Sequence, residues 1–272
     1  MAKVRADVLL VERGLAESRA KAQRLVMAGQ VRADGQIVDK PSSMFEGEVQ
    51  LEIDRGPRYV SRGGEKLEAA LEGFGVEVAG KVCADVGAST GGFTDCLLQH
   101  GASKVYAVDV GKGQLDWKLR QDARVVVMEE TNARYLAALP EVSDLVTVDA
   151  SFISLKTLLP VMKGWLSERG QLIALVKPQF EAGKQEVGKG KGVIRDEQIH
   201  RRVLAEILEF VEGQGFGLRG LLRSPVLGPK GNVEFLLWAE RGGISIQTID
   251  SYIGRVFNES DSASGSAVKS GA

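Results

Sequence analysis

The sequence predicts an α/β protein in which a seven-stranded, doubly wound sheet with an antiparallel last strand follows a small α+β domain. Three observations lead to this prediction. From Lys66 onward, short apolar segments alternate regularly with amphipathic ones, as strands and helices do in a mostly parallel sheet. A glycine-rich loop, Asp85–Asp95 (DVGASTGGFTD), follows the first apolar segment. The first 45 residues instead contain two short helical segments and a turn signal, so we expect a separate domain there.

The composition is that of a globular chain with room for one large and one small domain. Of its 272 residues, 44% are hydrophobic and 26% are charged. No segment approaches the ~18 consecutive apolar residues of a membrane helix, and the N-terminus lacks the apolar core of a signal peptide. We therefore expect a cytoplasmic protein without a membrane partner. Its two cysteines, Cys83 and Cys96, are too few for a disulfide framework or a zinc site, so we expect both to be buried and no metal to be bound.

Residues 1–45 are predicted to form two helices and a hairpin. The elements are Val8–Arg13 capped by Asp7, Arg19–Ala28 capped by Ser18, and strands Gln30–Arg32 and Gln36–Val38 around the turn Asp34-Gly35. The segment carries eight basic and five acidic residues, a net charge of +3 against −1 for the whole chain, which is a modest excess. The arrangement resembles the S4-like RNA-binding domain, which grips structured RNA through backbone and shape. The resemblance implies RNA contacts by Arg5, Arg19, Lys21 and Arg24.

Residues 46–65 are interpreted as an extended interdomain linker. Val49–Ile53 has the pattern of an extended segment, and the basic, glycine-rich run RGPRYVSRGGE follows it. Arg62 in this run is a further candidate RNA contact. The large domain is then expected over 66–257, and the tail 258–272, rich in serine, glycine and alanine, is expected to be disordered.

Seven strands are predicted in the large domain. They lie near 82–85, 105–109, 125–128, 144–148, 171–177, 217–223 and 233–240. The last connection, Ser224–Gly231, is too short for a helical crossover, so the seventh strand must return antiparallel to the sixth. This is the methyltransferase variant of the Rossmann-like sheet.

The glycine-rich loop predicts the kind of cofactor. Its spacing of Gly87, Gly91 and Gly92 is not the G-x-G-x-x-G of dinucleotide-binding proteins, and no P-loop lysine follows. Asp85, on the first strand, suits a ligand with positive charge, and S-adenosylmethionine carries an ammonium and a sulfonium. We therefore expect S-adenosylmethionine as the cofactor. The contacts expected from this segment are Asp85, Gly87, Ser89, Thr90, Gly91, Gly92 and Phe93.

The same loop is open to two other interpretations. Gly87–Gly91 fits G-x-S-x-G, the turn that presents the serine nucleophile of a hydrolase, with Ser89 in that role. A hydrolase of this kind also needs a histidine in a loop after a late strand, whereas His100 and His200 both fall in helical segments. The other interpretation is a glycine turn that only packs a helix against a strand.

Charged residues converge on one edge of the predicted sheet, where ligands bind at the carboxyl ends of parallel strands. Asp109 ends the second strand, about twenty residues beyond the loop, a position at which an acid binds the ribose hydroxyls of a nucleotide. Four other residues reach the same edge: Asp149 and Lys177 at strand ends, Glu234 near the start of the antiparallel strand, and Lys66 at the start of the helix before the first strand.

This set of four suits methyl transfer to a ribose 2′-hydroxyl, a poor nucleophile that needs a base and in-line placement. A lysine serves as a base if burial or a nearby cation lowers its pKa to roughly 7 to 8. Lys177 is the candidate base with Lys66 nearby, although the pattern leaves either lysine open. Asp149 and Glu234 are expected to orient the two ammonium groups and the ribose.

Several motifs together indicate a known family. They are RYVSRGGEKL, DVGASTGGFTD, VDVGKGQL, TNAR, DASFISL, LVKPQFE, GKGVIRD and GNVEF. The chain resembles the TlyA family of ribosomal RNA 2′-O-methyltransferases, which join an S4-like domain to an FtsJ-like methyltransferase domain and were long labelled haemolysins. The resemblance implies a target cytidine in the 16S or 23S ribosomal RNA of ribosomal subunits. It places the family's catalytic set on Lys66, Asp149, Lys177 and Glu234, and further cofactor contacts on Asp109, Val110, Asn132 and Asp149.

Some features leave alternatives open. Tyr59 stands where the family often has a tryptophan, which puts a signalling role of that position in question. Phe152, Phe180 and the glycine-rich run Glu181–Arg195 are expected to form a mobile lid, in which either ring stacks on a flipped base or both rings pack beneath the lid. The alternative functions are a non-catalytic RNA-binding module and a haemolysin-type membrane-active protein, for which the sequence offers no span and no strongly amphipathic basic helix.

Overall fold

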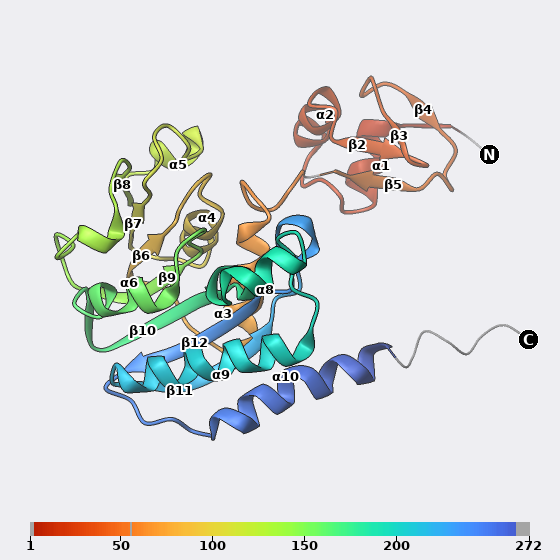
Figure 1. Cartoon of the computed structure of the whole chain (residues 1–272). Coiled ribbons are helices and arrows are strands. Elements are labelled where there is room, and N and C mark those ends of the chain that lie inside the picture. Colours follow the sequence, from red (N-terminus) through yellow and green to blue (C-terminus); the bar gives the residue numbers. More distant parts are fainter. Residues whose placement is uncertain (1–2, 55, 265–272) are drawn as a thin grey trace, which may run out of the picture. The chain divides into compact units, whose positions relative to one another are not determined.

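The computed structural model describes residues 3–54 and 56–264, which form two compact units, Met1–Arg58 and Tyr59–Ala272 (Figure 1). The N-terminal unit contains β1 (Val4–Arg5), α1 (Ala6–Glu12), α2 (Arg19–Met27), β2 (Val31–Ala33), β3 (Gln36–Ile37), β4 (Met44–Phe45) and β5 (Leu51–Ile53). Strands β3, β2 and β5 form one antiparallel sheet, and β1 pairs with β4. Apolar residues of α1 and α2, such as Leu10 and Ala22, are fully buried against the sheet residue Val31.

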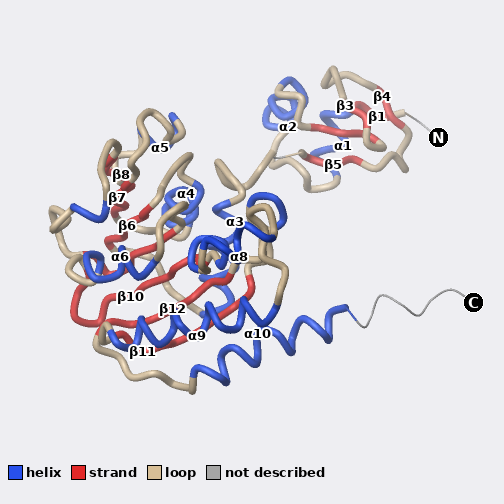
Figure 2. The backbone as a smooth tube through the Cα atoms, in the orientation of Figure 1, coloured by secondary structure: helices blue, strands red, loops and turns tan. Residues whose placement is uncertain are grey.

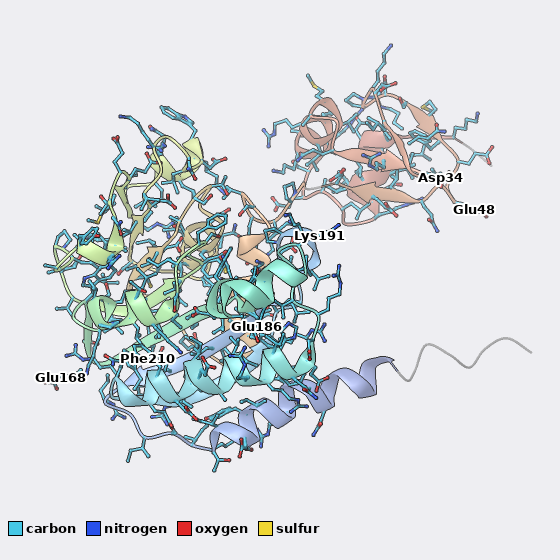
Figure 3. The ribbon with its side chains drawn as sticks, in the orientation of Figure 1. Asp34, Glu48, Glu168, Glu186, Lys191 and Phe210 are labelled. Atoms are coloured by element: carbon cyan, nitrogen blue, oxygen red, sulfur yellow. The ribbon has the colours of Figure 1, made fainter. Side chains whose placement is uncertain are left out.

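The predicted second helix and hairpin of this unit are confirmed. Helix α2 begins after Ser18, whose hydroxyl accepts a hydrogen bond from the Lys21 backbone N–H at 3.3 Å. The hairpin turns through Asp34 and Gly35, at φ 47° and 80°, and Asp34 is labelled in Figure 3. Two consecutive left-handed residues are the geometry of the type I′ hairpin turn, which asparagine or aspartate before glycine favours.

The predicted cap of the first helix is wrong. Helix α1 begins at Ala6, so Asp7 lies in its first turn, fully buried. The Asp7 carboxylate accepts hydrogen bonds from Arg5 at 2.9 and 3.0 Å, from Arg19 at 3.0 Å and from Gln23 at 2.8 Å. The Arg5 guanidinium, with these other donors, holds the pKa of Asp7 well below its usual range. This residue therefore joins β1, α1 and α2 instead of capping a helix.

The predicted linker and tail also differ from the structure. Residues Leu51–Ile53 form β5, which pairs with β2, so part of the expected linker belongs to the N-terminal sheet. At the other end, helix α3 already begins at Gly63, and the units divide between Arg58 and Tyr59. Helix α10 (Ile249–Ser264) runs through the first part of the tail expected to be disordered from residue 258, and residues 265–272 lie outside the described residues.

The C-terminal unit contains the predicted seven-stranded sheet, in the order β11-β12-β10-β9-β6-β7-β8 (Figure 2). The strands are β6 (Val82–Val86), β7 (Lys104–Val108), β8 (Val125–Met128), β9 (Ser143–Val148), β10 (Leu166–Val176), β11 (Phe216–Arg223) and β12 (Phe235–Arg241). The helices besides α10 are α3 (Gly63–Phe74), α4 (Gly92–Gln99), α5 (Trp117–Arg120), η1 (Ala133–Tyr135), α6 (Leu155–Met162), α7 (Pro178–Glu181), α8 (Lys184–Lys189), α9 (Glu197–Gly213) and η2 (Pro229–Gly231). Strand β12 is antiparallel to both of its neighbours, β10 and β11, which confirms the predicted topology.

Two apolar layers cover the two faces of this sheet. Successive strand residues point to opposite faces, so Ala84 contributes to the layer formed with α6, α9 and α10, whereas Cys83 contributes to the layer formed with α3, α4 and α5. Cys83 and Cys96 are both fully buried, as predicted. Tyr59 is also buried, against α3, where a side chain at Gly64 would come within 2.1 Å of the Tyr59 ring. Among the described residues, no helix combines the length and apolar content needed to cross a membrane.

Candidate active site

Two adjoining cavities lie at the carboxyl ends of the parallel strands of the C-terminal unit. The first has a volume of about 280 Å³ and is lined by the glycine-rich loop, the start of α3, the segments after β9 and β10, and the loop before β12. The second, of about 330 Å³, lies over the ends of β6, β7 and β9. Residues Gly87, Ser89, Asp149 and Ser151 line both cavities, so the two share a wall.

The glycine-rich loop is shaped by positions where only glycine fits. Gly87 and Gly91 have φ angles of 83° and 96°, which favour glycine. A β-carbon at Gly87 would also lie 2.8 Å from the Asp149 carbonyl oxygen, and one at Gly91 would lie 2.2 Å from the Leu119 side chain. The loop therefore passes directly against the segment that follows β9.

Asp109 organises the loops around the second cavity. Its carboxylate accepts hydrogen bonds from the backbone N–H groups of Ser89 at 2.8 Å and Gly111 at 2.7 Å. It lines the cavity together with Val110 and Asn132, so the structure brings these three predicted cofactor residues together. Each carboxylate oxygen has a further lone pair for a hydroxyl donor. Sequence reasoning missed Gln114, which lines the same cavity and accepts a hydrogen bond from the Ser89 hydroxyl at 3.3 Å.

Other predicted cofactor residues take different places. Thr90, Gly92 and Phe93 line the first cavity, whereas Asp85 and Gly91 line neither of the two. The Asp85 carboxylate is fully buried beneath the loop, where it accepts a hydrogen bond from the Thr94 hydroxyl at 2.7 Å. Burial raises the pKa of Asp85 to about 7. Its role in this structure is thus to hold α4 to β6 from below.

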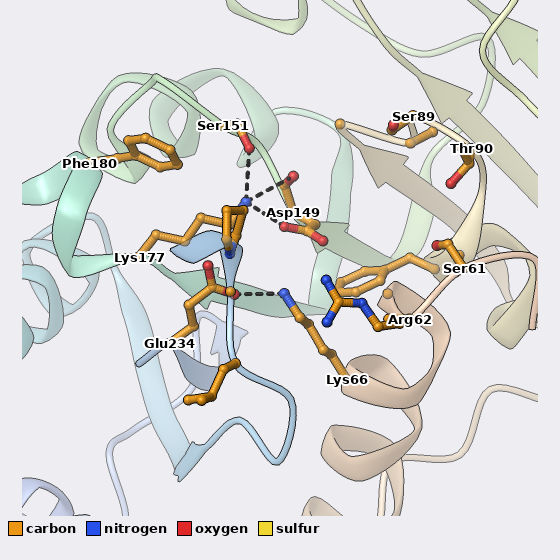
Figure 4. Close-up of a pocket in the computed structure, with 18 residues that line it drawn as sticks. Ser61, Arg62, Lys66, Ser89, Thr90, Asp149, Ser151, Lys177, Phe180 and Glu234 are labelled. Carbon is orange, nitrogen blue, oxygen red and sulfur yellow. Dashed lines mark hydrogen bonds and ion pairs between the residues drawn. The ribbon is translucent and has the colours of Figure 1, made fainter. Parts of the chain in front are cut away.

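The four charged residues predicted to converge all line the first cavity, where they form two ion pairs (Figure 4). Lys66 Nζ lies 2.6 Å from Glu234 Oε2, and Lys177 Nζ lies 2.6 Å from Asp149 Oδ1. Lys66, Lys177 and Glu234 are buried, with exposed fractions of 7%, 6% and 1%. The charge of Lys66 is balanced by its own carboxylate instead of acting on Lys177 as an unpaired cation. A buried ion pair is weak evidence for stability, so two ion pairs that face one cavity mark a candidate functional site.

Lys177 contacts the wall that the two cavities share. Its Nζ donates to the Ser151 hydroxyl at 3.1 Å and to the Asp149 carbonyl at 3.4 Å. It also lies 5.7 Å from the centre of the Phe180 ring. Because Asp149 and Ser151 line both cavities, this ion pair is the one that adjoins the second cavity.

Phe152 is held in an unusual, exposed conformation. Its side chain is 89% exposed, and its φ is 63°, which is uncommon for a bulky residue and costs free energy. Its ring lies 4.9 Å from that of Phe180, and the two rings line the second and first cavities respectively. The expectation that both rings pack beneath a lid is therefore wrong for Phe152.

The geometry excludes Ser89 as the nucleophile of a hydrolase triad. Its hydroxyl donates to Gln114, whereas the His100 ring contacts the Cys96 carbonyl at 2.9 Å and the His200 ring contacts the Ile194 carbonyl at 3.1 Å. His200 is also buried. Within the described ranges, no group of three His, Cys, Asp or Glu residues has the arrangement of a metal site.

The predicted RNA-contacting residues are divided between the two units. Arg62 is exposed and lines the first cavity (Figure 4). In the N-terminal unit, Arg19, Lys21 and Arg24 are exposed on α2. Arg5 and Arg19 are both tied to the Asp7 carboxylate.

Comparison with known proteins identifies both units. Residues 59–241 match the FtsJ-like methyltransferase family, and residues 4–51 match the S4 domain. The chain is 49% identical over 267 residues to "Putative rRNA methyltransferase YqxC" of Bacillus subtilis, covering 94% of each chain. It is 48% identical over 240 residues to "16S/23S rRNA (cytidine-2'-O)-methyltransferase TlyA" of Mycobacterium tuberculosis, covering 87% of this chain and 89% of that one. A solved structure, "Putative hemolysin from Streptococcus thermophilus", aligns with a TM-score of 0.71 at 42% identity, over 97% of this chain and 99% of the other.

Proposed function

Because this chain belongs to the FtsJ-like methyltransferase family, we propose that it methylates the ribose 2′-hydroxyl of a cytidine in 16S or 23S ribosomal RNA within ribosomal subunits, which would place it in the cytoplasm. The observation that carries the proposal is that two ion pairs, Lys66–Glu234 and Lys177–Asp149, lie in the cavity beside the glycine-rich loop. The relative from Mycobacterium tuberculosis is named for this reaction, which supports the choice of substrate.

The second cavity fits S-adenosylmethionine. Ala133, Ile153 and Leu158 give it an apolar wall suited to a flat adenine ring, and Asp109 offers a carboxylate to the ribose hydroxyls. Gly87 and Ser89 would hold the methionine end at the wall shared with the first cavity. When bound, the cofactor supplies an electrophilic methyl group on its sulfonium.

Lys177 is the proposed base. In its neutral form, its Nζ accepts the proton of the 2′-hydroxyl as the oxygen takes up the methyl group, and the ammonium that results lies beside the Asp149 carboxylate. Lys177 is preferred to Lys66 because its ion pair adjoins the second cavity. Lys66 and Glu234 then bind and orient the ribose, so that the hydroxyl approaches in line.

The remaining contacts would position the RNA. Phe152, exposed at the rim, is proposed to stack with Phe180 against the base of a flipped cytidine. Arg62 would bind a phosphate beside the target. In the N-terminal unit, Arg5, Arg19, Lys21 and Arg24 would contact the RNA backbone, two of them in orientations fixed by Asp7.

The proposal is tested by mapping ribose methylation by mass spectrometry on ribosomal subunits incubated with protein and labelled cofactor. We expect a single modified cytidine with the wild type, and a loss of roughly 100-fold or more in the single-turnover rate with Lys177→Ala. Lys163→Ala, a lysine at the end of α6 that lines neither cavity, is the matched control. Unchanged methylation by a folded Lys177→Ala variant would contradict the assigned base. Calorimetry without any cofactor binding, even with RNA present, would instead favour a non-catalytic RNA-binding module.

A further inference from the structure

The Glu234 carboxylate is held at both of its oxygens. Oε2 accepts a hydrogen bond from the Lys66 ammonium at 2.6 Å, and Oε1 accepts a hydrogen bond from Gln179 Nε2 at 3.1 Å. Gln179 is itself buried, with 7% of its surface exposed, and it lies on α7 two residues after Lys177. The two residues flank Pro178, the first residue of α7, whose ring fixes the local backbone.

The orientation of the Gln179 amide follows from its neighbour. A carboxylate oxygen only accepts hydrogen bonds, so the nitrogen of the amide must face Glu234. The amide oxygen is then left buried, without a hydrogen-bond partner among the described residues. An unsatisfied buried acceptor is destabilising, so packing alone does not explain a glutamine at this position. The contact with Glu234 does.

Gly228 restricts the space around Glu234 Oε1 from another side. A β-carbon at Gly228 would lie 2.0 Å from Glu234 Oε1. The φ of Gly228 is −69°, which any residue adopts, so its lack of a side chain matters for space and not for backbone conformation. The backbone before η2 therefore closes over the oxygen that Gln179 binds.

We propose that Gln179 is a positioning residue that acts through Glu234. By fixing Oε1, it leaves Oε2 directed at Lys66 and so sets the place of the Lys66 ammonium in the first cavity. The inference rests on the proposed function, in which Lys66 and Glu234 orient the ribose. Lys177 and Gln179 belong to one short segment. That segment therefore positions both the proposed base, Lys177, and the amide that orients Glu234.

Substitution of Gln179 by glutamate gives a pH-dependent test. A protonated carboxyl group at this position donates a hydrogen bond to Glu234 as the amide does, whereas an ionised one would oppose a second carboxylate, and two such groups share one proton. Relative to wild type at each pH, we expect Gln179→Glu to be within about threefold at pH 6 and to fall roughly 10- to 100-fold by pH 8.5. Gln179→Met cannot donate a hydrogen bond, so its rate relative to wild type is expected to be lowered by the same factor at pH 6 and at pH 8.5.

The measurements are single-turnover methylation of ribosomal subunits at saturating cofactor and calorimetric cofactor affinity. We expect cofactor affinity within about twofold of wild type, because Gln179 lines neither cavity. Gly228→Ala is expected to lower the rate without the pH dependence of the glutamate variant. Gln198→Glu, exposed on α9, is the matched control and should follow the wild-type profile. Thermal melting of each variant shows whether it is folded.

Two results would overturn the inference. One is a Gln179→Glu profile parallel to that of wild type across the pH range; the other is a folded Gln179→Met variant with the wild-type rate. Failure of the proposed function gives a different result, since wild-type protein would then leave ribosomal RNA unmethylated.

Discussion

In each unit, a buried carboxylate is bound by a basic side chain and by a glutamine amide, as Asp7 and Glu234 show, yet these two clusters differ in what surrounds them. Asp7 is bound by Arg5, Arg19 and the amide of Gln23, and Glu234 is bound by Lys66 and the amide of Gln179. The side chains of Arg5 and Arg19 are 37% and 56% exposed, whereas that of Lys66 is 9% exposed.

The difference in exposure suits the two clusters to different roles. Arginine stays charged at all relevant pH values, so a buried aspartate beneath exposed guanidinium groups is suited to holding fixed positive charge for RNA. Lys66 and Glu234 instead line a cavity, beside a second lysine–carboxylate pair. The same kind of local arrangement therefore fixes exposed positive charge in the N-terminal unit and fixes a lysine inside a cavity in the C-terminal unit.

The largest effect is expected when the negative charge of the Lys66–Glu234 pair is removed. Glu234→Gln leaves Lys66 without its carboxylate, so the ribose is misplaced and the single-turnover rate falls by about 100-fold or more. Glu240→Gln is the matched control, because Glu240 lies on β12, the strand that begins directly after Glu234, pairs with Arg219 at 2.9 Å and lines neither cavity. Equal rates for the two variants would mean that Glu234 has no special role in the reaction.

A change in the Asp7 cluster should instead alter the stability of the N-terminal unit. Asp7→Asn removes the charge that binds two arginines, and we expect the N-terminal unit to lose about 1 to 2 kcal/mol of stability, because the arginines that remain are exposed to water, measured by denaturant unfolding. Asp39→Asn, exposed on the same unit, is the control. Because the pKa of Asp7 is lowered from its usual 3.8, its contribution is present above about pH 4 and is lost as the pH falls below that value. A variant as stable as wild type at pH 7 would show that the contacts of Asp7 with the two arginines do not stabilise the N-terminal unit.

Asp85, a third buried carboxylate, sharpens the comparison because the side chains that hydrogen-bond to it are the hydroxyls of Thr94 and Thr147 instead of cations. Burial raises its pKa from 3.8 to about 7, so ionising Asp85 destabilises the folded protein. This destabilisation is absent below about pH 4 and fully present above about pH 7, so the free energy of unfolding falls as the pH rises between these values. Asp85→Asn should abolish this dependence, with a gain over wild type of roughly 2 kcal/mol at pH 8 relative to pH 5. Unfolding free energies that change with pH equally in both proteins would contradict this assignment.

The sequence predicts the features that depend on strand order and strand ends. The alternation of segments gives the seven strands, and the short connection Ser224–Gly231 gives the antiparallel β12. Because strand ends meet at one edge, the predicted topology alone brings together Lys66, Asp149, Lys177 and Glu234. Position next to a strand end, or at the start of α3 for Lys66, is thus enough to find the four charged residues of the first cavity.

What the sequence misses depends on contacts between distant segments. Asp7 satisfies the local pattern of a helix cap, but its partners Arg19 and Gln23 come from a second helix. Gln179 meets Glu234 across 55 positions, a separation that no local pattern encodes. Leu51–Ile53 joins the N-terminal sheet only because β2 offers it a partner. Asp85 has the right place on its strand, but its depth below the loop depends on the packing of α4.

The place of β12 in the sheet has a consequence for synthesis of the protein. It is the last of the described strands, yet it lies between β10 and β11, so these two strands have no shared partner until residue 241 has been made. Domains generally fold as units, with the N-terminal one first during translation. A nascent chain therefore contains the arginines proposed to contact RNA well before it contains Glu234, and the first cavity is complete only once β12 has been inserted between β10 and β11.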